Sequence, residues 1–233
     1  MENKRKKIYI IIVLTFAGLL IGNSCKHQKS TDKNSSSFYL KVYDTGSSID
    51  VLTLTWLNKN NESFTDTLQK HDENFTIHGK VPYPVKGYLE SPQSREYFPF
   101  ILHNDTVIIK LSDNHLYNSS IEKSDLNMEW QNIVKTSEKN YKEINYLFPK
   151  IQKARLQNDH VTLESIYKEI EAIKNEQKVF LIEYIEKHPQ SKLNPIILND
   201  LYINYPKDSL MIKSKVDLLN SQAKIGLIDE LLN

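Results

Sequence analysis

The stretch FPFILHNDTVIIKLSDNHLYNSSIEKSDLNMEWQNIV, which runs from Phe98 to Val134, contains the point at which the hydrophobic pattern of the chain changes. Up to Leu111, apolar residues alternate with polar ones, which is the pattern of half-buried strands. From about Ser124 they recur every three or four residues, as in an amphipathic helix. The sequence therefore predicts an α+β protein in which the strands come first and the helices follow.

Upstream of this point, the period of two extends back to Phe38. The alternating runs are separated by short polar sequences such as DTGSS, NKNNES and KHDEN, which favour turns. This pattern predicts a small antiparallel β sandwich or barrel over residues 38–122. Its alternating apolar positions are Phe38, Leu40 and Val42, then Leu52, Leu54 and Trp56, then Phe75 and Ile77, and finally Val107, Ile109 and Leu111.

Downstream of this point, residues 123–233 carry two long apolar stripes, Leu126–Ile151 and Leu163–Tyr184. Each stripe recurs with the period of a helix, with Lys, Glu and Asn on the other faces. Pro149 is expected to kink or end the first helix, and the second is expected to stop before Pro189. Shorter helices follow, so the second half is predicted to be an all-helical bundle or hairpin.

The first 24 residues have the pattern of a bacterial secretion signal. The cationic cluster Lys4–Lys7 precedes the apolar run Ile8–Ile21, which is short for a transmembrane helix, and small residues follow. Cys25, the chain's single cysteine, stands where a lipoprotein signal places its lipid acceptor. We therefore expect residues 1–24 to be a lipoprotein signal peptide and Cys25 to be lipidated. An unlipidated thiol beside an ordinary cleavage site, or an uncleaved anchor, is the alternative.

Residues 25–37 are polar and lack periodicity, so we interpret them as a tether that holds the folded part away from a membrane. The expected location is the bacterial cell envelope, with the outer membrane favoured over the inner. Removal of residues 1–24 takes away four basic residues and one acidic residue, which leaves 26 basic and 28 acidic residues and a net charge of −2. This balance lacks the basic footprint of a nucleic-acid-binding protein.

The sequence DTGSS, which begins at Asp44, resembles the active-site loop of an aspartic protease. Such an enzyme needs two copies of the loop, because two carboxylates share one proton. This chain has one copy, and the later glycines, Gly79, Gly87 and Gly226, do not supply the Gly-rich segment of a retroviral-type homodimer. We therefore interpret the loop as a turn with Gly46 at positive φ, and a protease acting through Asp44 is the least favoured function.

Other signs of site chemistry in the sequence are few. Seven histidines are scattered without metal-ligand spacing, and no cofactor is expected. The cluster EYFPF, Glu96–Phe100, fits either a small aromatic binding face or a strand that enters the core, and the core is favoured. Three short sequences, which begin at Asp66, Asp105 and Asp208, resemble the acceptor pattern for periplasmic O-glycosylation in Bacteroidetes-type bacteria. They point to Thr67, Thr106 and Ser209.

The stretch DTLQKHDENFTIHGKVPYPVKGYLE, Asp66–Glu90, resembles the signature of a domain of unknown function. That domain precedes the thioredoxin domain in Bacteroidetes-type lipoproteins of the AhpC/TSA and thiol-disulfide oxidoreductase class. The resemblance continues through FPFILHNDTVIIKL, through SDLNMEWQNIV, where Ser-x-Leu-Asn begins the helices, and through FLIEYIEKHPQS. It covers nearly all of Phe38–Asn233, and the residues of the first stretch that fit are Asp66, Thr67, Phe75, Gly79 and Pro84.

The resemblance implies a fold and a location but not an activity. In that family the redox chemistry belongs to the thioredoxin domain and its Cys-x-x-Cys pair, and this chain has no second cysteine. The expected function is therefore a non-catalytic, lipid-anchored envelope domain that binds a partner protein or a ligand. The alternative is the accessory subunit of a split thiol-disulfide system whose thioredoxin half is a separate chain.

The segment VDLLNSQAKIGLIDELLN, at the end of the sequence, is rich in apolar residues. With little chain left to cover them, these residues predict an interface for self-association or for a partner protein through a C-terminal helix. The alternative is that the segment folds back onto the helical bundle. The residues concerned are Leu218, Leu219, Ile225, Leu227, Ile228, Leu231 and Leu232.

Overall fold

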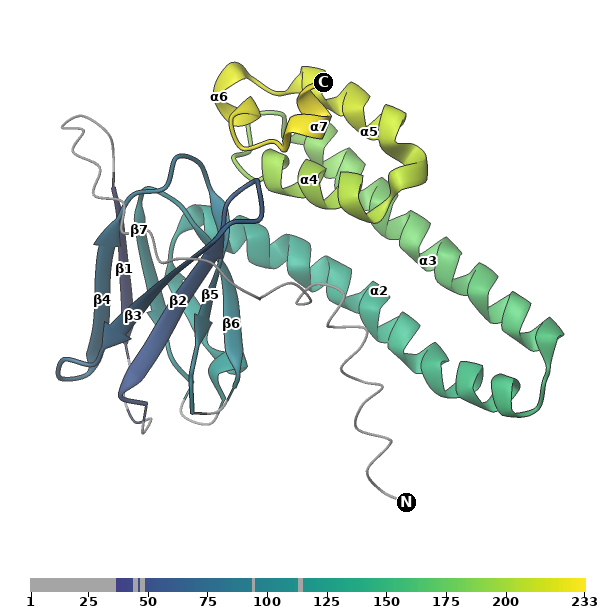
Figure 1. Cartoon of the computed structure of the whole chain (residues 1–233), viewed down its shortest axis with the longest axis horizontal. Coiled ribbons are helices and arrows are strands. Elements are labelled where there is room, and N and C mark those ends of the chain that lie inside the picture. Colours follow the sequence, from purple (N-terminus) through teal and green to yellow (C-terminus); the bar gives the residue numbers. More distant parts are fainter. Residues whose placement is uncertain (1–36, 44–45, 47–48, 94, 113–114) are drawn as a thin grey trace. The chain divides into compact units, whose positions relative to one another are not determined.

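The structure is a computed structural model that describes residues 37–43, 46, 49–93, 95–112 and 115–233. Strands come first and helices follow, which confirms the predicted α+β order (Figure 1). The described residues all belong to one compact unit. The strands are β1 (Phe38–Tyr43), β2 (Val51–Leu57), β3 (Ser63–Gln69), β4 (Asn74–Gly79), β5 (Val85–Glu90), β6 (Tyr97–Leu102), β7 (Thr106–Lys110) and β8 (Ser120–Lys123).

The helical part begins directly after β8, whose last residue falls one position inside the range expected for the helices. Two long helices are followed by short ones. The α-helices are α2 (Asp125–Leu156), α3 (His160–Lys187), α4 (Asn194–Asn204), α5 (Ser209–Ser214), α6 (Ser221–Lys224) and α7 (Asp229–Leu232). The 3-10 helices are η2 (Leu116–Asn118), η3 (Pro206–Asp208) and η4 (Lys215–Leu218).

The strands form two four-stranded sheets. Sheet A has the order β4-β1-β7-β8 and sheet B the order β3-β2-β5-β6. Among the described strands, all pairs are antiparallel except β1 with β7, so the antiparallel prediction is correct apart from this pair. Because β1 and β2 belong to different sheets, the segment between them connects the sheets and does not close a hairpin. Asp44, Thr45 and Ser47 lie outside the described residues.

The core of the β part lies between the two sheets, as expected for a sandwich. Every strand from β1 to β7 contributes inward-facing residues, because alternate side chains point to the same face. Leu40, Leu54 and Leu89 have no exposed surface. Gly79 is required opposite Phe38 in the β1–β4 register, since a Cβ at position 79 would lie 2.5 Å from the phenyl ring.

The start of α2 is fixed to the edge of sheet B by one buried side chain. The Asn127 carboxamide accepts a hydrogen bond from the Ile101 backbone N–H (2.6 Å) and donates one to the Ile101 carbonyl (2.8 Å). Because β6 is an edge strand, these backbone groups would otherwise lack a partner. Asn127 thus satisfies the outward-facing backbone groups of Ile101 in the way that a neighbouring strand would.

Two further polar residues complete this contact. Ser124 caps α2. Its hydroxyl accepts hydrogen bonds from the backbone N–H of Asn127 (3.3 Å) and from the side-chain amide of Asn127 (2.9 Å). His103 Nε2 lies 2.9 Å from the same hydroxyl. All three residues are buried. The Ser-x-Leu-Asn sequence therefore builds the joint between sheet and helix.

A second core joins the outer face of sheet B to the helices. Ile101 points away from the sandwich core and packs with residues of α2, α3, α4 and the C-terminal segment. Within α4, Ile197, Leu198 and Leu201 are almost completely buried. The sheet and the helical part therefore share apolar surface, which stabilises their contact.

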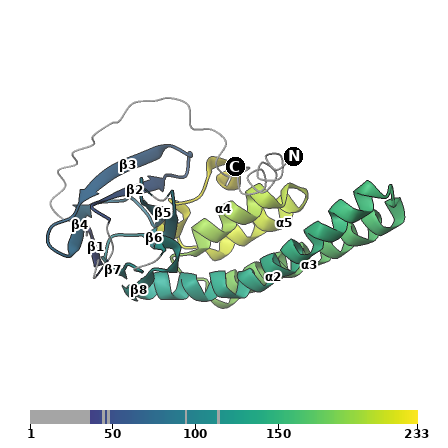
Figure 2. The ribbon, with the colours of Figure 1, turned by 90° about the horizontal axis from the view of Figure 1, so that it is seen from below.

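The helices α2 and α3 form an antiparallel hairpin (Figure 2). Its far half has a small core of its own, made by Leu147, Ile151, Ile166, Ile170 and Ile173. Nearer the sheets a buried polar layer crosses the hairpin, in which the Gln177 side-chain amide donates to the Ser137 hydroxyl (2.6 Å) and accepts from Asn140 (2.9 Å).

Pro149 was expected to kink or end the first long helix. It lies inside α2, which continues to Leu156, so the expectation that the helix ends at this residue is wrong. A proline removes one backbone hydrogen bond, but Leu147 and Ile151 on either side are buried against α3, and this packing outweighs the loss. The end of α3 at Lys187, before Pro189, is as predicted.

We predict that Asn127→Ala lowers the free energy of unfolding by about 2–4 kcal/mol, because it leaves both backbone groups of Ile101 unpaired in a buried position. Urea unfolding measures the change. Asn132→Ala, an exposed position on the same helix, is the matched control and should have a much smaller effect. Equal effects of the two substitutions would contradict the role of Asn127 in the joint.

We also predict that His103 makes stability depend on pH. Burial, assisted by Lys192 and opposed by Asp105, holds the pKa of His103 below its usual value, so the folded state keeps the imidazole neutral. The unfolded chain binds the proton at its ordinary pKa of about 6.5. Stability should therefore fall as the pH drops through about 6.5, and His103→Gln should reduce this slope in urea unfolding at several pH values. An unchanged slope would contradict the role of His103 in this pH dependence.

Candidate functional site

An ion pair joins sheet B to the helices on the outer face of the sheet. The Lys86 ammonium on β5 lies 2.6 Å from each carboxylate oxygen of Asp200 on α4. Both side chains are about three-quarters buried, and the Lys86 nitrogen lies 5.9 Å from the centre of the Trp130 ring on α2. One strand and two helices therefore place charged and aromatic groups together.

Two tyrosines extend this group along the sheet. Tyr88 follows Lys86 on the same face of β5, and its ring meets the Tyr97 ring of β6 edge to face at 6.0 Å. Tyr97 is 47% exposed, so its ring is available to a ligand. We call Lys86, Tyr88, Tyr97, Trp130 and Asp200 the Tyr88 cluster.

The electrostatics of the Tyr88 cluster favour binding over proton transfer. Burial raises the pKa of the Tyr88 phenol above its usual value; Lys86 opposes this effect and Asp200 adds to it. The phenol therefore stays protonated at neutral pH and can donate a hydrogen bond. Lys86 and Asp200 neutralise each other, so the surface offers aromatic rings and hydroxyl donors beside a paired charge.

A second polar group lies between α2 and α3. The Tyr184 hydroxyl donates a hydrogen bond to the Glu129 carboxylate and lies 3.0 Å from the Ser191 hydroxyl. Burial raises the pKa of Tyr184, and the hydrogen bond to Glu129 raises it further. The phenol therefore stays protonated, and the group fastens the end of α3 to α2.

The EYFPF sequence is divided between the two faces of sheet B. Phe98 and Phe100 are buried in the sandwich core, as the favoured interpretation predicted, whereas Tyr97 points outward into the Tyr88 cluster. Glu96 accepts a hydrogen bond from His115 Nδ1 (2.8 Å) and one from the backbone N–H of Leu116 (2.7 Å). The hydrogen bond from His115, and to a smaller extent the one from Leu116, holds the pKa of Glu96 below its usual value.

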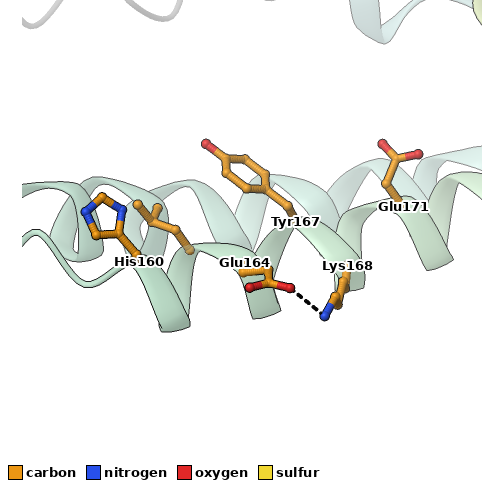
Figure 3. A pocket seen from close by; sticks show the side chains of 6 residues that line it. His160, Glu164, Tyr167, Lys168 and Glu171 are labelled. Atoms are coloured by element: carbon orange, nitrogen blue, oxygen red, sulfur yellow. Dashed lines mark ion pairs between the residues drawn. The ribbon is translucent and has the colours of Figure 1, made fainter.

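A shallow hollow runs along α3, but its side chains do not converge (Figure 3). Tyr167 and Glu171 point away from Glu164 and Lys168, which form an exposed ion pair at 2.7 Å. Because one helix supplies the whole lining, the hollow does not enclose a ligand. Its lining residues are His160, Leu163, Glu164, Tyr167, Lys168 and Glu171.

The other residues predicted to carry chemistry fall in different places. Cys25 and Asp44 lie outside the described residues. Thr67 is exposed on β3, Thr106 is half-buried on β7 and Ser209 is half-buried at the start of α5. Their glycosylation stays a prediction.

The C-terminal segment forms short helices, η4, α6 and α7, and part of it folds back onto the bundle. Leu219, Leu227 and Leu231 are at most 5% exposed, so the expectation that the chain cannot cover them is wrong. The Asn199 carboxamide holds the segment by donating to the Gly226 carbonyl (2.9 Å) and accepting from the Ile228 N–H (3.1 Å).

Other apolar residues of the same segment remain accessible. Leu218, Ile225 and Leu232 are 41–47% exposed, while Ile228 is partly buried against the helical core. The role of the exposed residues as an interface stays a prediction.

The described part of the chain holds no group of three or more His, Cys, Asp or Glu side chains arranged to bind a metal ion. Within the same residues, no helix has the length and apolar content needed to cross a membrane.

Sequence reasoning missed the Tyr88 cluster because its members are far apart in the chain. Lys86 and Asp200 are separated by 114 positions, and neither belongs to a local motif. The one available signal was that Lys86, Tyr88 and Glu90 occupy the outward positions of an alternating strand. That signal places them on one face but does not identify what covers it.

Comparison with known proteins adds little to this description. No protein-family model matches the chain, and no curated protein matches it. Among solved structures, the chain is similar to one described as the NMR structure of the protein from Eubacterium rectale, with 15% sequence identity. The match covers 41% of this chain and 98% of that chain with a TM-score of 0.28, a similarity too low to support a conclusion about fold or function.

Proposed function

We propose that this chain is a non-catalytic, lipid-anchored domain of the bacterial cell envelope that binds a partner protein or a ligand through the Tyr88 cluster. The signal pattern before Cys25 supports the anchor and the location. The main support for the proposed binding surface is the exposed Tyr97 ring, which lies beside Tyr88 and the Lys86–Asp200 pair.

The composition of this surface is typical of recognition. Tyrosine and tryptophan provide large contact areas at low entropic cost, and tyrosine adds a hydrogen-bond donor. The ion pair fixes Lys86 and holds β5 against α4, so the surface is rigid before a ligand arrives. Rigid aromatic residues at the junction of a sheet and a helical part are a common basis for binding sites.

The first prediction from this proposal concerns the anchor. Cys25→Ala should abolish incorporation of a fatty-acid analogue in metabolic labelling, because the substitution removes the acceptor thiol. Ser24→Ala, beside the acceptor, is the matched control and should retain labelling. Labelling that survives Cys25→Ala would show that the lipid is attached elsewhere.

The second prediction concerns the binding surface. Tyr97→Ala should weaken binding of the partner by about thirtyfold, or about 2 kcal/mol, as for a central aromatic residue of an interface. The measurement is co-purification from detergent-solubilised envelopes, followed by titration with the recovered component.

Tyr141→Ala is the matched control, since Tyr141 is also an exposed tyrosine but lies about 16 Å along α2 from Trp130 of the Tyr88 cluster. A component retained by Tyr141→Ala and lost with Tyr97→Ala supports the proposed surface. Equal recovery with both variants would contradict it. If the component is a separate thioredoxin-fold chain, the accessory role in a split thiol-disulfide system is favoured over an independent binding function.

A further inference from the structure

The α2–α3 hairpin carries opposite charges on its two helices. Over residues 135–155, α2 has six basic and two acidic side chains. Over residues 164–183, α3 has five acidic and three basic ones. The two helices of the hairpin therefore differ in the sign of their charge.

The basic residues of α2 form a stripe on one side of the hairpin. Lys139, Lys142, Tyr146 and Lys150 recur at helical spacing and line a shallow hollow together with Glu143 and Leu147 of the same helix and Glu169 of α3. We call these four residues of α2 the basic stripe. Since Glu169 lines the same hollow, the basic stripe and this part of α3 share one face of the hairpin.

An acidic stripe runs beside it on α3. Glu176 and Glu183 follow Glu169 at intervals of seven residues, which places all three along one side of the helix. We call these three residues the acidic stripe. The other side of α3 faces the short helices, since the Lys174 carbonyl accepts a hydrogen bond from Tyr205 and Lys178 pairs with Asp208 at 2.6 Å.

The two stripes do not neutralise each other within the hairpin. Among the described residues, the ion pairs of this face join side chains of the same helix, such as Lys139 with Glu143 (3.9 Å) and Lys142 with Glu138 (3.3 Å). The side chains of Lys139 and Lys142 are 81% and 77% exposed. Because such exposed pairs contribute little, both lysines can exchange these partners for the acidic groups of another molecule.

An aromatic residue lies within the basic stripe. Tyr146 is 72% exposed, and the Lys150 ammonium lies 4.8 Å from its ring centre. An exposed tyrosine surrounded by lysine stems offers apolar contact area beside the charges, which is the composition of an interface anchor.

We propose that this face of the hairpin binds the same face of a second copy of the chain. A two-fold axis parallel to the helices would place the basic stripe of each copy against the acidic stripe of the other, with both hairpin tips at the same end. A perpendicular axis in the interface would instead bring like stripes together. The charge pattern is therefore self-complementary for one two-fold arrangement, which yields a four-helix bundle.

The test uses the full-length protein in density-matched detergent, with sedimentation equilibrium as the measure of the dimer dissociation constant. One variant carries Lys139→Glu, Lys142→Glu and Lys150→Glu, and the other carries Glu169→Lys and Glu176→Lys. Each variant alone brings like charges together across the interface, so its dissociation constant should rise at least about tenfold. An equimolar mixture should restore dimers, because both contacts of the mixed pair join opposite charges.

Restoration in the mixture also shows that both variants are folded, since an unfolded variant cannot be rescued by its partner. Tyr146→Ala should weaken the dimer as well. Glu164→Lys combined with Lys168→Glu, on another side of α3, is the control and should leave the dissociation constant unchanged. A wild type that stays monomeric over the micromolar range at low salt, or a mixture that associates no better than its separate components, would overturn the proposal.

Discussion

The paired hydrogen bonds between Asn127 and Ile101 are the interaction on which the arrangement of the described chain depends. A strand at the edge of a sheet has backbone groups that need partners, and here one carboxamide satisfies both groups of a single residue. Because Asn127 lies in the first turn of α2, these bonds also fix where the helix begins and how it leaves the sheet. The serine cap and His103 surround the carboxamide with buried partners, so a substitution at any of the three affects the others.

The position of α2 has consequences for the Tyr88 cluster. Trp130 lies one helical turn after Asn127, and the fixed start of the helix brings its ring near Lys86. Ile101, held by Asn127 through its backbone, directs its side chain into the helical core that includes α4. Asp200 on α4 is thereby placed opposite Lys86. The joint between sheet and helices therefore assembles the candidate binding surface from three distant parts of the sequence.

Local patterns were enough to predict the order of elements, the core positions of the strands and the end of α3 before Pro189, because periodicity and proline act over a few residues. Contacts between distant residues were not predictable in this way. The parallel pairing of β1 with β7, the continuation of α2 through Pro149 and the burial of Leu219, Leu227 and Leu231 all depend on surfaces supplied by other segments. The Lys86–Asp200 pair was not predictable for the same reason. Neither residue belongs to a local motif, and the ion pair forms because the fold brings β5 and α4 into contact.

The two proposed surfaces differ in the stability of the structure beneath them. The Tyr88 cluster rests on a sheet whose inner face lines the sandwich core and whose outer face contacts the helical core through Ile101. The far half of the hairpin, by contrast, has five buried apolar residues at its centre. A helix of 32 residues, about 48 Å long, gains most of its stability from packing. The polar layer of Ser137 and Gln177 fixes the register of α2 against α3 and adds little to the stability of the hairpin. Local opening should therefore be easiest in the far half of the hairpin. A partner that binds only the closed hairpin stabilises it by mass action, so association on this face and order in the hairpin are coupled.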